Sequence, residues 1–118
     1  MADQTCTSID PETLEITAMD SLTPEYLFAQ VTDLKNMYSG ASTLDVYITI
    51  GGWTFSDNGT DTQPVFSDIA GDAAKRQKFA DNLVSFMTRY GFDGVNLDWE
   101  YPGAPDRGGL ERRIFQTL

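Results

Sequence analysis

Carboxylate and amide side chains recur at every second position near the carboxyl end of the sequence. Asn96, Asp98 and Glu100 follow one another at this spacing. The residues that alternate with them are apolar: Val95, Leu97 and Trp99. Because side chains alternate between the two faces of a β-strand, the polar residues share one face and the apolar residues share the other. A carboxyl group beside a second carboxylate can keep its proton near neutral pH and donate it, so this stretch predicts acid catalysis.

Glu100 occupies the position from which a catalytic acid would act. It is the last residue before the turn Tyr101-Pro102-Gly103. A parallel strand is normally covered on both sides and rarely carries a polar face, whereas the interior of an α/β barrel accommodates one. In such barrels the carboxyl ends of the strands face the mouth of the active site. We therefore expect Glu100 to donate the proton and Asp98 to be its ionised partner.

Two other interpretations of these carboxylates stay open. Asp98 and Glu100 can be solvated charges on an edge strand, because charged side chains are mostly exposed. Asp93, Asp98 and Glu100 also offer the oxygen ligands that hard cations prefer. The sequence lacks the loop spacing of an EF-hand, has no histidine and has a single cysteine, Cys6, so we expect no metal site and no cofactor.

Helices and strands alternate along the predicted structure. The first expected elements are a helix over 23–39, which starts at Thr23-Pro24 and ends at Gly40, and a strand over 44–50. A functional loop over 51–71 follows, and then a helix that Asp72 caps and Gly91 ends. The last expected elements are a strand over 92–100 and a further helix over 110–118. Residues 5–22 predict at most a short strand or a turn. This order is typical of parallel α/β folds.

Charge and hydrophobicity narrow the class of partner. The net charge is −10, from 18 acidic and 8 basic residues, which argues against binding to nucleic acid or to an anionic membrane surface. Hydrophobic residues make up 41% of the chain and aromatic residues 12%, which is enough for a packed core. No apolar run approaches the length of a membrane span. A neutral or weakly cationic partner fits this balance, and the oligomeric state stays open.

Two motifs resemble those of glycoside hydrolase family 18 chitinases. The run from Asp93 to Glu100, followed by Tyr101-Pro102, resembles the family signature D-x-x-D-x-D-x-E. Asp93, Asp98 and Glu100 match it, and Asn96 stands in the place of its middle aspartate. The run Thr49-Ile50-Gly51-Gly52-Trp53 is similar to the family pattern S-x-G-G, with threonine in the place of serine. The stretches 51–56 and 90–109 look most like fungal members.

The resemblance implies a fold and an extent. The fold class is α/β, as a fragment of a (β/α)8 TIM barrel that covers about strands 3 and 4 with their flanking helices. A closed barrel needs about 250 residues, and this chain has 118. We therefore expect residues 1–118 to be a partial family 18 catalytic domain, truncated in the helix after strand 4.

The resemblance also implies a reaction and a role for each matched residue. Chitin or a chito-oligosaccharide is cleaved at β-1,4 bonds between N-acetylglucosamine units, with retention, and the substrate's own acetamido oxygen is the nucleophile. Glu100 is the proton donor, Asp98 orients the acetamido group, and Asp93 supports the strand from outside the site. Asn96 can hydrogen-bond Asp98 but cannot take up its proton, which predicts weakened chemistry.

Residues of two loops are the expected substrate contacts. They are Gly51, Gly52, Trp53, Thr54 and Tyr101. The glycines can instead form a plain strand-ending turn, and Trp53 can instead be a core aromatic under the loop. The resemblance implies an extracellular protein, and the triplet Asn58-Gly59-Thr60 fits an N-glycosylation sequon that is compatible with secretion. A non-catalytic, lectin-like chitin-binding protein and a non-functional truncated product are the alternatives to the enzyme.

Overall fold

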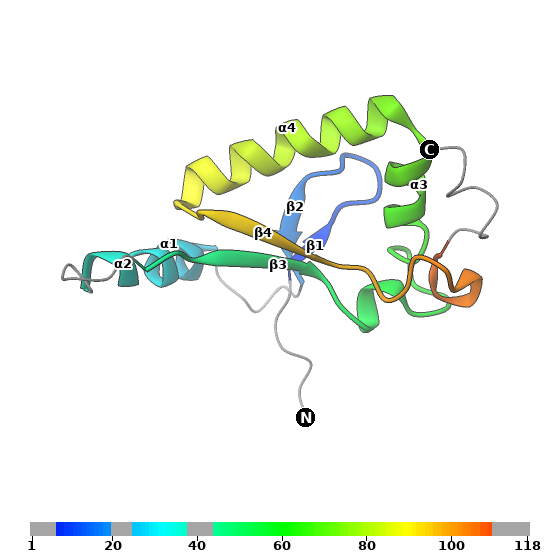
Figure 1. Ribbon diagram of the computed structural model, residues 1–118, viewed down its shortest axis with the longest axis horizontal. Coiled ribbons are helices and arrows are strands. Elements are labelled where there is room, and N and C mark those ends of the chain that lie inside the picture. Colours follow the sequence, from blue (N-terminus) through cyan, green and yellow to red (C-terminus); the bar gives the residue numbers. More distant parts are fainter. Residues whose placement is uncertain (1–6, 20–24, 38–43, 110–118) are drawn as a thin grey trace.

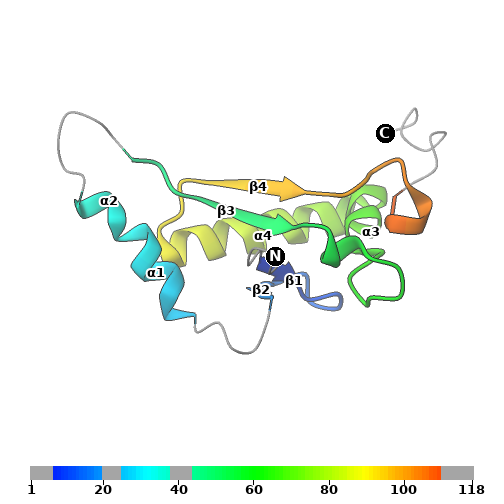
Figure 2. The same cartoon turned by 90° about the horizontal axis from the view of Figure 1, so that it is seen from below.

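The computed structural model describes residues 7–19, 25–37 and 44–109 and contains a sheet with α4 (Ala73–Tyr90) running along one of its faces (Figures 1 and 2). The described strands are β1 (Thr7–Ile9), β2 (Ile16–Ala18), β3 (Tyr47–Gly51) and β4 (Gly94–Asp98). They lie in the order β2-β1-β3-β4. Strands β1, β3 and β4 are parallel, and β2 is antiparallel to β1. Strands β3 and β4, which are consecutive along the chain and joined through helices, are thus parallel, as the sequence predicted.

The described helices are α1 (Tyr26–Thr32), α2 (Leu34–Met37), α3 (Val65–Gly71) and α4 (Ala73–Tyr90), with 3-10 turns η1 (Thr54–Ser56) and η2 (Pro105–Arg107). The predicted ends of α4 are confirmed. Asp72 accepts hydrogen bonds from the backbone N–H groups of Ala74 and Lys75 at 2.8 and 3.0 Å, which satisfies two donors that the first turn leaves unpaired. Gly91 ends the helix with φ of 84°.

Several of the predicted boundaries and elements are wrong, among them the strand predicted over 92–100, which covers only Gly94–Asp98 as β4. Residues 7–18 form the pair β1 and β2 rather than a single short strand or turn. The first predicted helix is two short helices that meet at Asp33, and β3 begins at Tyr47 rather than at Leu44. The predicted loop over 51–71 contains η1 and the whole of α3. Thr23, Pro24, Gly40 and the predicted helix over 110–118 lie outside the described residues.

The core lies between the sheet and helices α3 and α4. Its buried members are Ile9, Leu14, Ile16, Ile50, Phe55, Val65, Phe66, Ile69 and Phe79. Val95 and Trp99 pack against this cluster, and the Trp99 ring lies 5.7 Å from that of Phe66. The apolar face of β4 is therefore turned toward the helices, which leaves Asn96 and Asp98 on the face that the helices do not cover. The predicted alternation is confirmed for Val95 and Trp99, whereas Leu97 is 49% exposed.

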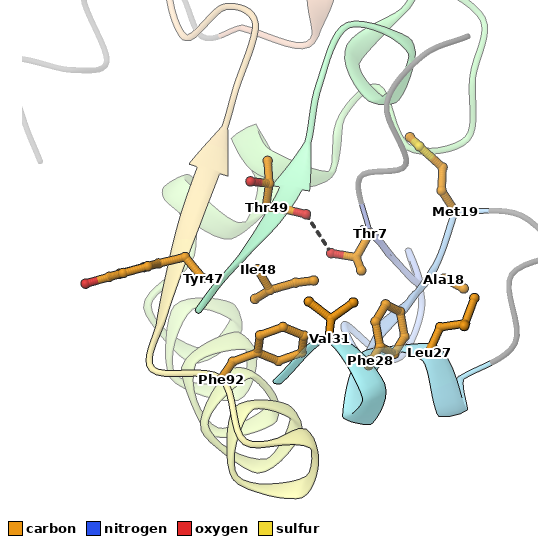
Figure 3. A pocket seen from close by; sticks show the side chains of 10 residues that line it. All are labelled: Thr7, Ala18, Met19, Leu27, Phe28, Val31, Tyr47, Ile48, Thr49 and Phe92. Atoms are coloured by element: carbon orange, nitrogen blue, oxygen red, sulfur yellow. Dashed lines mark hydrogen bonds between the residues drawn. The ribbon is translucent and has the colours of Figure 1, made fainter. Parts of the chain in front are cut away.

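A cavity of about 400 Å³ lies on the same side of the sheet as α1 (Figure 3). Its lining is mostly apolar, with Leu27, Phe28 and Val31 from α1 facing Ile48 of β3. The Thr7 hydroxyl donates to the Thr49 carbonyl at its edge, at 2.9 Å. None of the residues expected at the sugar site lines this cavity, which lies between α1 and the sheet.

Asp93 ties the amino end of β4 to the neighbouring elements. Its carboxylate accepts from the Val46 backbone N–H at 2.9 Å and forms an ion pair with Lys35 at 2.9 Å. The Lys35 ammonium also donates to the Gly91 carbonyl. The Val46 hydrogen bond and then the Lys35 ammonium hold the pKa of the Asp93 carboxyl below its ordinary value.

This lowered pKa gives Asp93 a pH-dependent contribution to stability. A carboxyl whose pKa is lower in the folded state stabilises the fold above its unfolded pKa of about 3.9, and the effect is lost as the pH falls through the folded pKa. We expect Asp93→Asn to lower the Tm equally at pH near 7 and near 5, and the difference from wild type to shrink below about pH 4. Thermal melts followed by circular dichroism would measure it. Asp61→Asn, at an exposed side chain, is the control, and a difference that persists in strong acid would contradict the assignment.

No helix in the described parts of the chain is both long and apolar enough to cross a membrane.

Candidate active site

The carboxyl ends of β3 and β4 lie side by side, at the same edge of the sheet (Figures 1 and 2). Gly51 is paired in register with Asp98. The Gly52 backbone N–H donates to the Asp98 carbonyl at 2.8 Å. This pairing brings the two predicted motifs together, because the chain leaves β3 toward Trp53 and leaves β4 toward Glu100 at the same place.

Gly51 makes this close pairing possible. Its φ is 108°, and a Cβ built on it would lie 2.4 Å from the Asp98 carbonyl oxygen and 2.9 Å from a ring carbon of Phe66. Real side chains do not approach so closely. The space that glycine leaves is filled by the neighbouring strand and a core aromatic, so Gly51 serves the strand pairing beneath the site.

The carboxylates of the second motif occupy the end of β4. Asp98 and Glu100 are partly buried and Asn96 is exposed. Strand β4 ends at Asp98, and Glu100 lies two residues further on, in the loop that follows. Asn96 is paired in register with Thr49 of β3, one step further from the edge. The peptide bond between Glu100 and Tyr101 is cis.

Two aromatic side chains flank this edge. Trp53 and Tyr101 are each 52% exposed, so Trp53 is not the buried core aromatic of the alternative interpretation. Thr54 is also exposed, at the first position of η1. An exposed indole or phenol beside two carboxylates offers a flat apolar surface, of the kind on which a pyranose ring packs.

Asp93 does not reach this edge. It precedes β4, whereas Glu100 follows it. Seven residues of extended chain separate the two side chains by roughly 20 Å. Asp93 therefore lies at the opposite end of β4 from Glu100, outside the candidate site.

Sequence reasoning missed Arg107, which is buried beside the predicted residues. It is 9% exposed, and its guanidinium lies over the Trp53 ring at 3.4 Å from the centroid. It also pairs with Asp57 at 3.1 Å. Neither Arg107 nor Asp57 belongs to a repeated pattern in the sequence, so only the fold brings them to notice.

Among the residues that the structure describes, no three His, Cys, Asp or Glu side chains are grouped so as to hold a metal ion.

Residues 3–115 match the sequence profile of the family described as glycosyl hydrolases family 18. The chain belongs to this family. Among family 18 relatives, chitinase A1 of Niallia circulans is 41% identical over 81 residues, which cover 69% of this chain and 10% of that protein. Chitotriosidase-1 of Mus musculus is 35% identical over 94 residues, which cover 80% of this chain and 18% of that protein.

Solved family 18 structures have the same arrangement of elements. A Group II chitinase catalytic domain of Ostrinia furnacalis superposes with a TM-score of 0.71 at 28% identity, covering 95% of this chain and 28% of that one. A Group IV chitinase of the same insect gives a TM-score of 0.69 at 26% identity, covering 95% and 29%. The expected α/β fold, as a fragment of a (β/α)8 barrel, is confirmed. The chain spans less than a third of the length of either structure.

The predicted fungal affinity of the stretches 51–56 and 90–109 stays a prediction.

Proposed function

We propose that this family 18 chain cleaves β-1,4 bonds of chitin or chito-oligosaccharides, with Glu100 as the proton donor. The observation that carries the proposal is the register of β3 and β4. The pair of Gly51 with Asp98 ends the two parallel strands together, and the chain continues from this carboxyl end to the exposed Trp53 after one strand and to Glu100 after the other. That end is where barrel enzymes hold their catalytic residues.

The proposed chemistry uses the substrate as its own nucleophile. Glu100 protonates the glycosidic oxygen while the carbonyl oxygen of the 2-acetamido group attacks the anomeric carbon, so the glycosidic bond breaks as a cyclic oxazolinium forms. Asp98 orients the acetamido group and stabilises the positive charge that develops on it. Water then opens the ring, with Glu100 taking up its proton, and the configuration is retained. These steps need only the two carboxylates and the acetamido group of the substrate.

The substrate class follows from the surface beside the carboxylates and from a neighbour. Trp53 and Tyr101 present exposed rings, and Thr54, Gly51 and Gly52 lie in the same loop as Trp53. The Group II chitinase domain was solved in complex with penta-N-acetylchitooctaose. A neutral sugar chain meets no repulsion from a net charge of −10. Because chitin is an insoluble polymer outside cells, this function favours an extracellular protein.

The direct test is release of a fluorescent leaving group from a chitobioside, with the corresponding cellobioside as the control. The cellobioside has a hydroxyl in place of the acetamido group, so it cannot supply the nucleophile. We expect hydrolysis of the chitobioside alone. Equal hydrolysis of both substrates would contradict the substrate-assisted mechanism. Hydrolysis of neither would show that the chain is not itself the enzyme.

Asn96 limits the rate in this scheme. An amide can donate a hydrogen bond to Asp98, but it cannot accept a proton from it as an aspartate would. We expect Asn96→Asp to raise kcat on the chitobioside by roughly tenfold, below the span of about 10²–10⁴ that a whole acid or base contributes. Asn96 is exposed, so the Tm should change little. An unchanged kcat would show that the amide does not weaken the reaction.

Asn96 also favours a second candidate, a lectin-like protein that binds chitin without cleaving it. Binding uses the aromatic surface of Trp53 and Tyr101 and does not need a proton shared between two carboxylates. Pull-down on chitin beads separates the two functions. Retention on chitin with no hydrolysis of the chitobioside would favour the lectin, and Trp53→Ala should then abolish retention.

A further inference from the structure

Arg107 is a buried cation to which the proposed chemistry assigns no part. It ends η2, in the loop that follows β4, and is 9% exposed. A buried guanidinium is costly unless its donors are paired. The partners that it has therefore indicate what it does.

Three hydrogen bonds and one ring contact of Arg107 reach the two loops of the candidate site. Its Nε donates to the Glu100 carbonyl at 3.0 Å. One terminal nitrogen donates to the Trp53 carbonyl, and the other donates to Asp57 at 3.1 Å. The planar guanidinium also covers one face of the Trp53 ring, 3.4 Å from its centroid. The Arg107 side chain thus hydrogen-bonds the backbone of Glu100, the proposed proton donor. It also contacts both the backbone and the ring of Trp53, the proposed sugar-binding aromatic.

The turn that carries Arg107 is fixed to the loop after β3. Gln63 donates from its side chain to the Asp106 carbonyl at 2.8 Å. Gly108 packs against the backbone of Gln63, and a Cβ built on Gly108 would lie 1.7 Å from the Gln63 carbonyl oxygen. Figures 1 and 2 show this turn, in orange, beside the green segment that follows β3. These contacts fix the turn that carries Arg107, and the hydrogen bonds of Arg107 in turn fix the backbone at Glu100 and Trp53.

We propose that Arg107 is a positioning residue that sets Glu100 and Trp53 at a fixed distance and angle from each other. The inference rests on the proposed function. The guanidinium occupies one face of the indole and leaves the other face for a pyranose, so the sugar that packs on Trp53 is presented to Glu100 in one orientation. A displacement of about 1 Å between a bound substrate and its catalytic group can cost about 10²-fold in rate.

Arg107→Lys and Arg107→Gln test this proposal, with Arg89→Gln as the matched control. Arg89 lies on α4 in an exposed ion pair with Glu25, so its loss removes the same charge away from the site. Lysine keeps the charge but has no planar fork to bond three acceptors at once. We expect kcat on the chitobioside to fall roughly tenfold in the lysine variant and about 10²-fold in the glutamine variant. KM should change less than threefold, and Arg89→Gln should match wild type.

A second readout does not depend on activity. In a Trp99→Phe background Trp53 is the only tryptophan, because the chain has two. We expect acrylamide to quench Trp53 fluorescence more strongly once Arg107 is lysine, since the covered face of the ring is released. Unchanged quenching, or an unchanged kcat in a hydrolysing protein, would overturn the proposal. Absence of hydrolysis in wild type would instead count against the proposed function, and the quenching alone would then decide the contact.

Discussion

Glu100→Gln is expected to lower kcat for chitobioside hydrolysis by about 10²–10⁴-fold, which is the usual contribution of a general acid. Glutamine has nearly the same shape as glutamate but no proton to give to the glycosidic oxygen. The backbone of residue 100 would stay where it is, because Arg107 bonds its carbonyl rather than its side chain. KM and the Tm should therefore be close to those of wild type. Initial rates over a range of substrate concentrations give both constants.

A change of leaving group separates a proton donor from a merely structural glutamate. A leaving group of lower pKa needs less protonation as it departs, so the deficit of Glu100→Gln should shrink when a dinitrophenyl replaces a methylumbelliferyl group. Glu12→Gln makes the same substitution on an exposed turn and should leave both rates unchanged. A deficit of the same size with both leaving groups would show that Glu100 does not protonate the departing oxygen.

The features of the fold that the sequence predicted are those set by neighbours along the chain. Alternation in β4 assigns Val95 and Trp99 to the core because every strand turns successive side chains to opposite faces. Asp72 and Gly91 mark the ends of α4 because a cap depends on donors and angles within one turn. Such patterns need no knowledge of what lies across the sheet.

The missed elements depend on distant segments. Helix α3 buries Val65, Phe66 and Ile69, but glycine, serine, aspartate and proline before and within it resemble a loop. Strand β1 is only three residues long. It pairs in parallel with β3, more than thirty residues further along, so its stability comes from a partner that local propensity does not reveal.

The candidate site likewise contains residues that a local pattern predicts and one that depends on distant segments. Asp98 and Glu100 were found because their spacing on a strand is a chemical pattern. Arg107 was not, because its acceptors lie at Trp53, Asp57 and Glu100, up to 54 residues away in the sequence. A charged residue in a loop is usually exposed, and only the packing of two loops makes this one buried.

Gly51→Ala is expected to destabilise the fold by about 3 kcal/mol or more, which is a large part of the roughly 5–15 kcal/mol typical of whole domains. Two costs add. A left-handed φ in a residue with a side chain costs about 1–3 kcal/mol, and an atom forced into a filled space costs about 1–3 kcal/mol. The new methyl would press on the Asp98 carbonyl and the Phe66 ring. Urea denaturation gives the free energy of unfolding.

Gly59→Ala isolates the first of these costs. Its φ is 83°, yet no atom lies within 4 Å of the position that a Cβ would take, so we expect a loss of only about 1–2 kcal/mol. The difference between the two variants measures the close pairing of β3 with β4. Equal losses of unfolding free energy in the two variants would show that glycine is needed at position 51 only for its φ angle. A larger loss at Gly51, with a lower kcat in the fraction that stays folded, would show that this contact also holds Asp98 and Glu100 in place.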